Sequence, residues 1–500
     1  MGEKVVATRF DLSDRQRYRR KLRECLMGLE RLLEEKRFER PRNLLGLELE
    51  LNLTDSDGLP RMMNDAVLDR IASRDFQTEL AQFNIEVNIP PHELSGRVLD
   101  RLAEELRTGL GYADRKAREV GAHIVMVGIL PTLGVHDLVS GNLSSDDRYT
   151  MLNERVLAAR GEEIRLDISG VEQLHCSSAS IVPEAACTSM QMHLQVTPAR
   201  FSEVWNAAQV VAGPQIAMGA NSPFAFGLEL WRETRPVLFQ QATDTRPEEL
   251  QLQGVRPLTW FGERWVNSAY DLFEENVRYF PALLPICAVE DPLRVLDSGG
   301  VPELNELTLQ NGTIYRWNRP VYAVADGIPH LRVENRIMPA GPTVADVVAN
   351  AAFYYGLVRA VAEAPRPLWT RMPFDVAAAN FEAGCRDGIN AVLRWPRSGR
   401  GSGLVEIPAI DLVRDELLPL AASGLDSWGI EPVDRDHYLG VIEGRCRRRM
   451  NGAQWQSETF HHNLERGLGR QPALVAMTLR YVELMHSGIP VHQWPVDAMD

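Results

Sequence analysis

No apolar run in this 500-residue sequence approaches the roughly 18 residues that a membrane-spanning helix needs. The first residues do not form a signal-peptide pattern either. We therefore expect a cytoplasmic chain with no membrane partner. Six cysteines without a Cys-x-x-Cys pair offer no metal-ligand spacing and favour buried, reduced thiols. The net charge of −14 argues against nucleic-acid binding, although a single nucleotide needs only local arginines or a metal.

Several catalytic motifs are also missing. There is no Gly-x-Ser-x-Gly and no His-Glu-x-x-His, so neither a serine hydrolase nor a zinc protease of these types is supported. The glycine-rich residues 396–403 lack the lysine and the strand–helix context of a P-loop, which indicates a loop tip instead.

Acidic side chains follow an alternating pattern in two stretches. Residues 45–53 (LGLELELNL) place leucines on one face of a strand and Glu48 and Glu50 on the other. Residues 83–91 (FNIEVNIPP) repeat the scheme, with Glu86 among the polar positions. Like charges lined up on one sheet face repel each other. A divalent metal bound through oxygen would relieve that repulsion, so both strands are candidates for metal ligands.

Two later stretches show the same alternation. Their polar positions are Gln191, His193 and Gln195 in residues 190–196, and His330, Arg332, Glu334 and Arg336 in residues 330–337. If all four strands share a sheet, its polar face carries at least four carboxylates, an imidazole and two guanidiniums. Metal ions, a phosphorylated nucleotide and a carboxylate substrate would fit such a face. Any one of these strands could have an ordinary solvated face, but the four together favour a site.

The order of patterns along the chain mixes strands with helices, which predicts an α+β fold. A first helix is expected to begin with a capping box of Ser13 and Gln16. Further predictions are a helix over 98–119, a buried strand over 123–129 and a long helix ending near Glu363. We divide the chain into an N-terminal helical segment (1–43), a catalytic body (44–365) and a mainly helical C-terminal region (366–500).

Five motifs occur in order along the chain. They are Gly46-Leu-Glu-Leu-Glu50, Phe83-Asn-Ile-Glu86, His193 between alternating apolar residues, Ala220-Asn-Ser-Pro-Phe224 and Arg332-Val-Glu-Asn-Arg336. Together they resemble the glutamate–cysteine ligase family, and most of all its second family, which includes bacterial carboxylate–amine ligases. The likeness covers residues 44 to 360. It implies a glutamine-synthetase-like fold, with a curved, largely antiparallel sheet open on its polar face and helices packed on the other side.

The same resemblance implies ATP and two or three Mg²⁺ ions as cofactors, with Mn²⁺ as an alternative. Family members phosphorylate the side-chain carboxylate of glutamate and let an amine displace the phosphate. Carried over by position, the metal ligands would be Glu48, Glu50, Glu86, His193 and Glu334. Glu79 would support the metal–phosphate assembly, and Arg336 would contact the transferring phosphoryl group or the substrate carboxylate. These last two are the expected catalytic residues.

A second set of residues is expected to contact substrate or nucleotide. Its members are Asn221, Arg235, Arg316, Arg319, Arg332, Gln191 and Gln195. Arg316 and Arg319 flank an aromatic residue, where a carboxylate or phosphate would fit, although a hairpin with surface arginines gives the same pattern. Several relatives carry histidine where Gln310 stands, which leaves the contact there open. His193 could instead hydrogen-bond a phosphate or belong to the core, because Mg²⁺ prefers oxygen ligands.

The chemistry agrees with these residues. A carboxylate is a poor electrophile, and phosphorylation turns one of its oxygens into a leaving group; that transfer needs Mg²⁺ ligands and guanidiniums. The leading hypothesis is an ATP-dependent ligase that joins the γ-carboxylate of glutamate to cysteine or another amine through an acyl phosphate. The alternatives are a phosphotransferase and a non-catalytic nucleotide- or amino-acid-binding protein. The expected partners are small molecules (amino acid, amine and ATP), and a homo-oligomer stays open.

Overall fold

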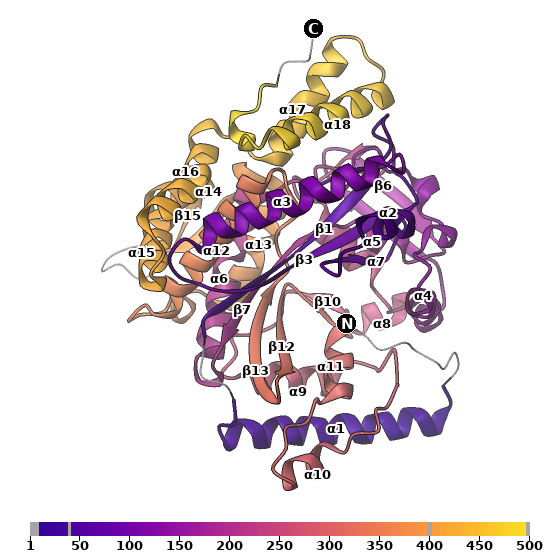
Figure 1. Ribbon diagram of the computed structural model, residues 1–500, viewed down its shortest axis with the longest axis vertical. Coiled ribbons are helices and arrows are strands. Elements are labelled where there is room, and N and C mark those ends of the chain that lie inside the picture. Colours follow the sequence, from indigo (N-terminus) through magenta and orange to yellow (C-terminus); the bar gives the residue numbers. More distant parts are fainter. Residues whose placement is uncertain (1–9, 39–41, 398–402, 497–500) are drawn as a thin grey trace.

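One curved sheet organises the fold. The computed structural model describes residues 10–38, 42–397 and 403–496. Seven strands lie in the order β12-β13-β7-β1-β3-β2, with β4 paired to β1, and every neighbouring pair is antiparallel (Figure 1). The strands are β1 (Leu44–Thr54), β2 (Phe76–Thr78), β3 (Asn84–Glu93), β4 (His123–Val125), β7 (Met190–Val196), β12 (Asn318–Ala325) and β13 (Ile328–Asn335). The predicted α+β fold with a curved antiparallel sheet is confirmed.

The alternation in the sequence gives the sheet two unlike faces. Leu45, Leu47 and Leu49 of β1 are at most 1% exposed and enter the hydrophobic core. Successive side chains of a strand point to opposite faces, so Glu48 and Glu50 lie on the other side. Burying the leucines therefore fixes which face carries the carboxylates.

Three helices cover the apolar face. They are α3 (Val98–Arg118), α6 (Phe201–Gly219) and α12 (Val344–Ala362) (Figure 1). The Tyr355 hydroxyl of α12 lies within hydrogen-bonding distance of two strand carbonyls, 3.2 Å from that of Gly46 and 3.0 Å from that of His193. Among the described residues, α12 is the one helix long and apolar enough to cross a membrane, and 78% of it is buried inside the protein.

The first helix begins earlier than predicted. Helix α1 (Leu12–Glu34) is capped by Asp11 and Asp14, so the prediction of a capping box of Ser13 and Gln16 is wrong. The Asp14 amide donates to the Asp11 carboxylate at 2.9 Å, and the Asp11 amide donates to Asp14 at 3.1 Å. Two carboxylates at a helix N-terminus also interact favourably with the helix dipole. The helix packs against α9 (Ala269–Tyr279), α10 (Pro292–Asp297) and α11 (Asn305–Gly312).

The strand predicted over 123–129 is shorter, because β4 ends at Val125. Its ladder covers only the last three residues of β1. Beyond it the Val127 carbonyl accepts from the Asn52 side chain at 3.2 Å, and the Gly128 amide donates to Asn221 at 3.2 Å. These backbone groups therefore find partners outside the strand ladder. The helices predicted over 98–119 and up to Glu363 are confirmed within a residue by α3 and α12.

The chain after residue 365 is mainly helical but also contains a hairpin. Strands β14 (Val392–Pro396) and β15 (Leu404–Pro408) pair on either side of the glycine-rich stretch. Residues 398–402 of that stretch lie outside the described residues, so the predicted loop tip falls largely there. The helices of this region are α13 (Phe374–Asp387), α14 (Ala409–Leu412), α15 (Leu418–Trp428), α16 (Pro432–Arg448), α17 (Gly452–Glu465) and α18 (Arg470–Ser487).

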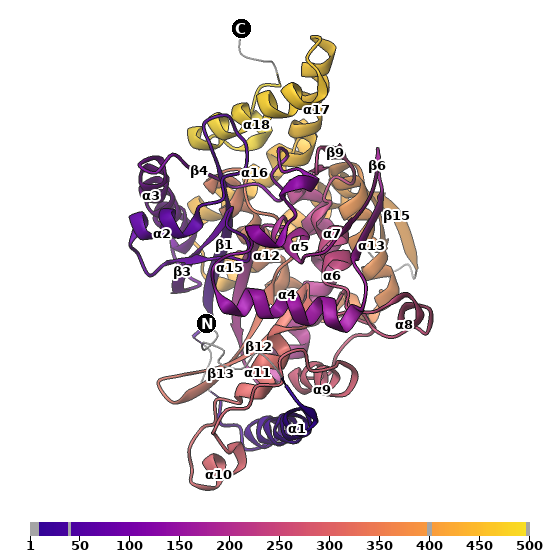
Figure 2. The same cartoon turned by 90° about the vertical axis from the view of Figure 1, so that its right-hand side faces the viewer.

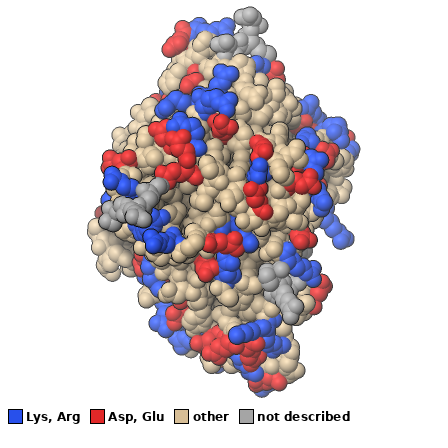
Figure 3. Space-filling view, turned by 90° about the vertical axis from the view of Figure 1, so that its left-hand side faces the viewer, with Lys and Arg blue, Asp and Glu red and all other residues tan. Residues whose placement is uncertain are grey.

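The remaining elements are short helices and strands outside the main sheet. The helices are α2 (Asn64–Ile71), α4 (Asp147–Arg160), α5 (Val182–Ala185), α7 (Arg235–Ala242) and α8 (Glu248–Leu252). The short strands are β5 (Ile164–Ser169), β6 (Gln173–Ser178), β8 (Phe224–Ala225), β9 (Leu228–Glu229), β10 (Thr259–Trp260) and β11 (Tyr315–Arg316). Figure 2 shows α17 and α18 at one end and α1 and α10 at the other. On the face drawn in Figure 3, basic and acidic side chains are interspersed.

Candidate active site

The register of the sheet brings the acidic strands together. Glu50 of β1 lies opposite Glu86 of β3, and Glu334 of β13 lies opposite His193 of β7. Strand β1 also pairs directly with β7. The prediction that the four alternating strands share one sheet is therefore confirmed, and their polar positions lie on one face.

Three carboxylates form a compact cluster, here called the inner acidic group: Glu50, Glu79 and Glu86. One ligand atom from each lies within 4.8 Å of the others. Burial, and then repulsion by Glu50, raises the pKa of Glu79 to about 8. Burial, and then repulsion by Glu79, raises the pKa of Glu86 to about 10. Burial also raises the pKa of Glu50. A divalent cation with a preference for oxygen, such as Mg²⁺ or Mn²⁺, fits this donor set.

A second cluster, here called the outer acidic group, consists of Glu48, His193 and Glu334. The His193 Nε2 atom lies 3.0 Å from Glu48 Oε1. Burial alone would raise the pKa of Glu48, but the hydrogen bond and charge of His193 outweigh it and lower that pKa. The Nδ1 atom of His193 is buried and has no hydrogen-bond partner among the described residues. Among the described residues, only the inner acidic group brings three ligand atoms within 4.8 Å of one another, so the outer acidic group is the less compact of the two.

Arginines surround Glu334. Arg319 donates to both of its carboxylate oxygens, at 2.9 and 2.8 Å, and Arg336 donates to one of them at 2.6 Å. These two guanidiniums outweigh the effect of burial and hold the pKa of Glu334 well below its ordinary value. Glu334 thus stays ionised, and it fixes Arg336 at the sheet face.

Arg336 connects the two acidic groups. Its Nη1 atom donates to Gln191 Oε1 at 2.5 Å as well as to Glu334, and the Gln191 amide donates to Glu50 Oε1 at 2.9 Å. The other Glu50 oxygen accepts from the Ser189 backbone amide at 2.6 Å. This series of hydrogen bonds, from Glu334 through Arg336 and Gln191 to Glu50, therefore places a guanidinium between the two acidic groups.

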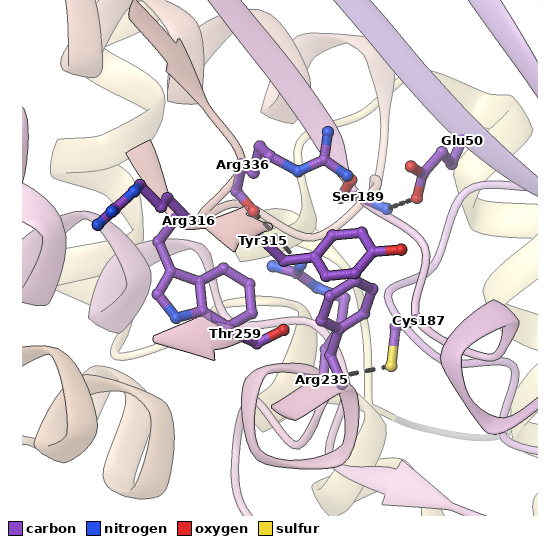
Figure 4. A pocket seen from close by; sticks show the side chains of 10 residues that line it. Glu50, Cys187, Ser189, Arg235, Thr259, Tyr315, Arg316 and Arg336 are labelled. Carbon is purple, nitrogen blue, oxygen red and sulfur yellow. Dashed lines mark hydrogen bonds between the residues drawn. The ribbon is translucent and has the colours of Figure 1, made fainter. Parts of the chain in front are cut away.

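Two small cavities open beside Arg336. The first, about 20 Å³, is drawn in Figure 4, where the Tyr315 hydroxyl points toward the side that carries Glu50 and Cys187. The second, about 60 Å³, is lined by members of the inner acidic group and by Glu184. Both cavities contact Glu50, Cys187, Phe239 and Arg336. The guanidinium of Arg336 and the carboxylate of Glu50 therefore border both cavities.

Two arginines expected to bind substrate line the first cavity, but both already have partners. Arg235 donates from Nε to Glu233 at 3.0 Å and from its other nitrogens to the carbonyls of Arg336 and Ile337. Arg316 is paired with Glu275 at 3.0 Å, and its side chain points away from the cavity in Figure 4. Their hydrogen bonds indicate that they support the cavity wall.

The other expected contacts divide between the sheet face and the interior. Asn221 is buried away from the polar face, where its side-chain amide donates to the Ala340 carbonyl at 2.7 Å and to the Tyr481 hydroxyl at 2.8 Å. Arg332 and Gln195 are register partners on β13 and β7, at positions of the polar face. Gln191, Arg319, Arg332 and Gln195 are thus brought to the site, whereas Asn221 is not.

Sequence reasoning missed Glu184, which lines the second cavity, and Tyr315, which lines the first. Glu184 lies on α5, a helix of four residues with no alternating pattern. Tyr315 lies on the two-residue strand β11, and its hydroxyl hydrogen-bonds the Glu184 carboxylate. Neither element is long enough for periodicity to reveal which way its side chains point.

The raised pKa values predict how the metal-free protein responds to pH. Glu79 and Glu86 have an ordinary value of 4.5 when unfolded and values of about 8 and about 10 when folded. Above pH 4.5 the unfolded chain loses these protons before the folded protein does, so the free energy of unfolding should fall as pH rises towards 8 and beyond. We expect the melting temperature in a chelator to fall over this window.

Saturating Mg²⁺ should reduce that fall, because it binds the ionised carboxylates of the folded protein. Melting curves at several pH values, with chelator and with Mg²⁺, measure both effects. A melting temperature in chelator that rises between pH 5 and 8 would contradict this interpretation of the inner acidic group.

Comparison with known proteins places these features in a family context. The family model described as Glutamate-cysteine ligase family 2 (GCS2) matches residues 44–459. That match runs well past residue 360, the end of the stretch over which the sequence resembles the family. No curated protein sequence matches the chain.

Two solved structures show a similar fold. Glutamate–cysteine ligase from Francisella tularensis, solved in complex with AMP, is 12% identical; the alignment covers 92% of this chain and 91% of that one, with a TM-score of 0.55. A bifunctional glutathione synthetase from Pasteurella multocida is 11% identical, with 92% of this chain and 55% of that one covered and a TM-score of 0.51. At these identities the likeness concerns the fold.

Proposed function

The chain belongs to glutamate–cysteine ligase family 2, whose model spans residues 44–459, and from this premise we propose that it is an ATP-dependent carboxylate–amine ligase. We propose glutamate as the donor of a γ-carboxylate, which is joined to an amine through an acyl phosphate with release of ADP and phosphate. One observation carries the proposal: Arg336 lies between the inner and outer acidic groups on a single sheet face.

The two acidic groups are the proposed metal sites. Glu50, Glu79 and Glu86 would hold one Mg²⁺, and Glu48, His193 and Glu334 would hold another. When bound, the ions would neutralise phosphate charge and help to align the γ-phosphate with the donor carboxylate. The raised pKa values of Glu79 and Glu86 support this assignment, because a buried cluster of three carboxylates needs protons or a cation.

The residues then divide the chemistry between them. A carboxylate oxygen of the donor attacks the γ-phosphorus of ATP, and the bond to ADP breaks. Arg336 stabilises the negative charge that spreads over the transferring phosphoryl oxygens. The amine loses one proton to water, and its neutral nitrogen attacks the acyl carbon; the carbon–oxygen bond to phosphate breaks, and the nitrogen gives a second proton to water. Glu334 and Gln191 hold Arg336 in place through both steps.

Nucleotide binding has support from the fold. The Francisella tularensis ligase was solved with AMP, and its alignment with this chain covers nearly the whole length of both. We propose that ATP binds at the polar face here as well. The cytoplasmic location, the three-part division of the chain and the number of ions stay predictions, and the family match crosses the proposed boundary at residue 365 without interruption.

The test is ADP release, measured with ATP, Mg²⁺ and glutamate in the presence and absence of acceptor amines. We expect ADP only when glutamate and an amine are both present, and a higher melting temperature with Mg²⁺–ATP because the ligand binds only the folded state. ADP release that needs no amine would indicate a phosphotransferase. No ADP with any amine and no change in melting temperature would indicate a protein without this activity.

A further inference from the structure

One carboxylate at the site has no cation of its own. Glu184 lines the second cavity together with Glu50, Glu79 and Arg336. It is half-buried, and within the described parts of the chain no lysine, arginine or histidine forms an ion pair with it. Its hydrogen-bond partner is the neutral Tyr315 hydroxyl. Burial raises the pKa of Glu184 to about 7, which shows that its negative charge is poorly compensated.

Glu184 also stands apart from the proposed metal ligands. The inner acidic group is defined by ligand atoms within 4.8 Å of one another, and Glu184 is not a member. Two charged residues affect the pKa of Glu184: Arg336 lowers it and Glu50 raises it. A positive group bound in this cavity would therefore meet Glu184 on one side while lying next to the guanidinium at which the acyl phosphate forms.

The walls offer little to a second negative charge. Arg336 is the one cation among the residues that line the second cavity. Arg235 and Arg316 line the neighbouring first cavity, where Glu233, Glu275 and backbone carbonyls hold them. Arg336 is needed for the phosphoryl group. A carboxylate placed in this cavity would meet Glu184 and Glu79, and none of the lining residues offers it a second cation besides Arg336; burying an unpaired charge is costly.

An amine acceptor arrives from water as a cation. Resting on the ligase function proposed above, we infer that the acceptor is an amine without a carboxylate beside its amino group, bound as a cation by Glu184. Tyr315 orients the Glu184 carboxylate by its hydrogen bond. The acceptor site thus selects a simple amine or a diamine over an α-amino acid such as cysteine.

One neighbouring arginine offers the rival arrangement. Arg148 of α4 is exposed and is close enough to Tyr315 and Tyr149 to influence both hydroxyls. An α-amino acid could be held with its carboxylate on Arg148 and its amino group on Glu184. A carboxylate on the acceptor weakens binding in the first arrangement and strengthens it in the second. Acceptors that differ only in that carboxylate therefore distinguish the two arrangements.

The experiment compares each amino acid with its decarboxylated amine as acceptor: alanine with ethylamine, cysteine with cysteamine, and ornithine with putrescine. ADP release is measured with saturating Mg²⁺–ATP and glutamate. We expect kcat/KM to be higher for the amine in every pair by roughly tenfold or more, the cost of an unpaired buried carboxylate. Higher kcat/KM for the amino acids would overturn the inference.

Variants locate the contact. Glu184→Gln should raise the acceptor KM by roughly 10- to 100-fold while changing the KM for glutamate and for ATP by less than about twofold. Glu154→Gln, an exposed position on α4, is the matched control and should change none of them. A rise in the KM for glutamate instead would mean that Glu184 holds the donor, and weaker acceptor binding in Arg148→Gln would support the rival arrangement; either result overturns the inference.

Direct binding keeps this inference separate from the proposed function. Ethylamine and alanine can each be titrated by calorimetry into the protein with Mg²⁺ and a non-hydrolysable ATP analogue. Tighter binding of ethylamine, lost in Glu184→Gln, supports the inference even if no turnover is found. Equal or weaker binding of ethylamine refutes it, whether or not the protein is a ligase.

Discussion

Replacing Arg336 with lysine is expected to lower kcat by roughly two orders of magnitude or more, the usual loss when one preorganised electrostatic contact is removed. Arg336 reaches Glu334 at 2.6 Å and Gln191 at 2.5 Å from one nitrogen, which leaves the rest of the guanidinium for a phosphoryl group. Lysine keeps the charge but cannot make the same fork of hydrogen bonds. Mg²⁺–ATP binding measured without acceptor should change much less, because the contact matters most in the transition state.

The fold should tolerate this change. Glu334 would still be paired with Arg319 at 2.8 Å, so no buried carboxylate is left without a cation. Arg294→Lys, at a position that is 88% exposed, is the matched control and should keep full activity. If folded Arg336→Lys protein has the kcat of the wild type, the placement of the phosphoryl group beside Arg336 is wrong.

Glu86→Gln should affect both turnover and stability, and in opposite directions. Losing a proposed metal ligand is expected to lower kcat by roughly a hundredfold or more. The metal-free variant should nevertheless melt at a higher temperature than the wild type at pH 8. The wild type must keep Glu86 protonated up to about pH 10 while the unfolded chain loses that proton near 4.5, and glutamine removes this difference.

Mg²⁺ provides the second measurement for Glu86→Gln. The rise in melting temperature on adding Mg²⁺ should shrink in the variant, because the inner acidic group has lost a ligand. Glu93→Gln changes an exposed carboxylate at the end of the same strand and should behave like the wild type in every assay. A Glu86→Gln protein with normal turnover, or with lower metal-free stability, would assign the residue a structural role.

The sheet was predictable because its signal is local. Alternation along residues 45–53 and 83–91 depends only on which face of a strand is buried, and that choice decides where Glu48, Glu50 and Glu86 point. The same argument placed His193 and Glu334 correctly on the polar face. Which of these residues lie opposite one another depends on the register of the strands, and only the structure shows that register.

Other parts of the site depend on contacts between distant segments. The resemblance to relatives pointed to Asn221 as a ligand contact, but its amide is committed to Ala340 and Tyr481, 119 and 260 residues away in sequence. No pattern in the sequence around Asn221 predicts either hydrogen-bond partner. Arg235 and Arg316 are likewise paired with carboxylates, those of Glu233 and Glu275, and the sequence alone does not show these pairs. Sequence reasoning identified chemically suitable residues, but could not determine which of them already had partners.

The contact of Tyr355 with two strand carbonyls has a mechanical consequence. This tyrosine joins the core helix α12 to β1 and β7 directly behind the carboxylates. When Glu50, Glu79 and Glu86 are ionised they repel one another, and a deformable sheet would let them move apart. The interior resists that movement because close-packed side chains have low compressibility. The packing of an apolar helix therefore keeps the carboxylates close together, and substitutions deep in α12 should let them move apart although no polar residue is changed.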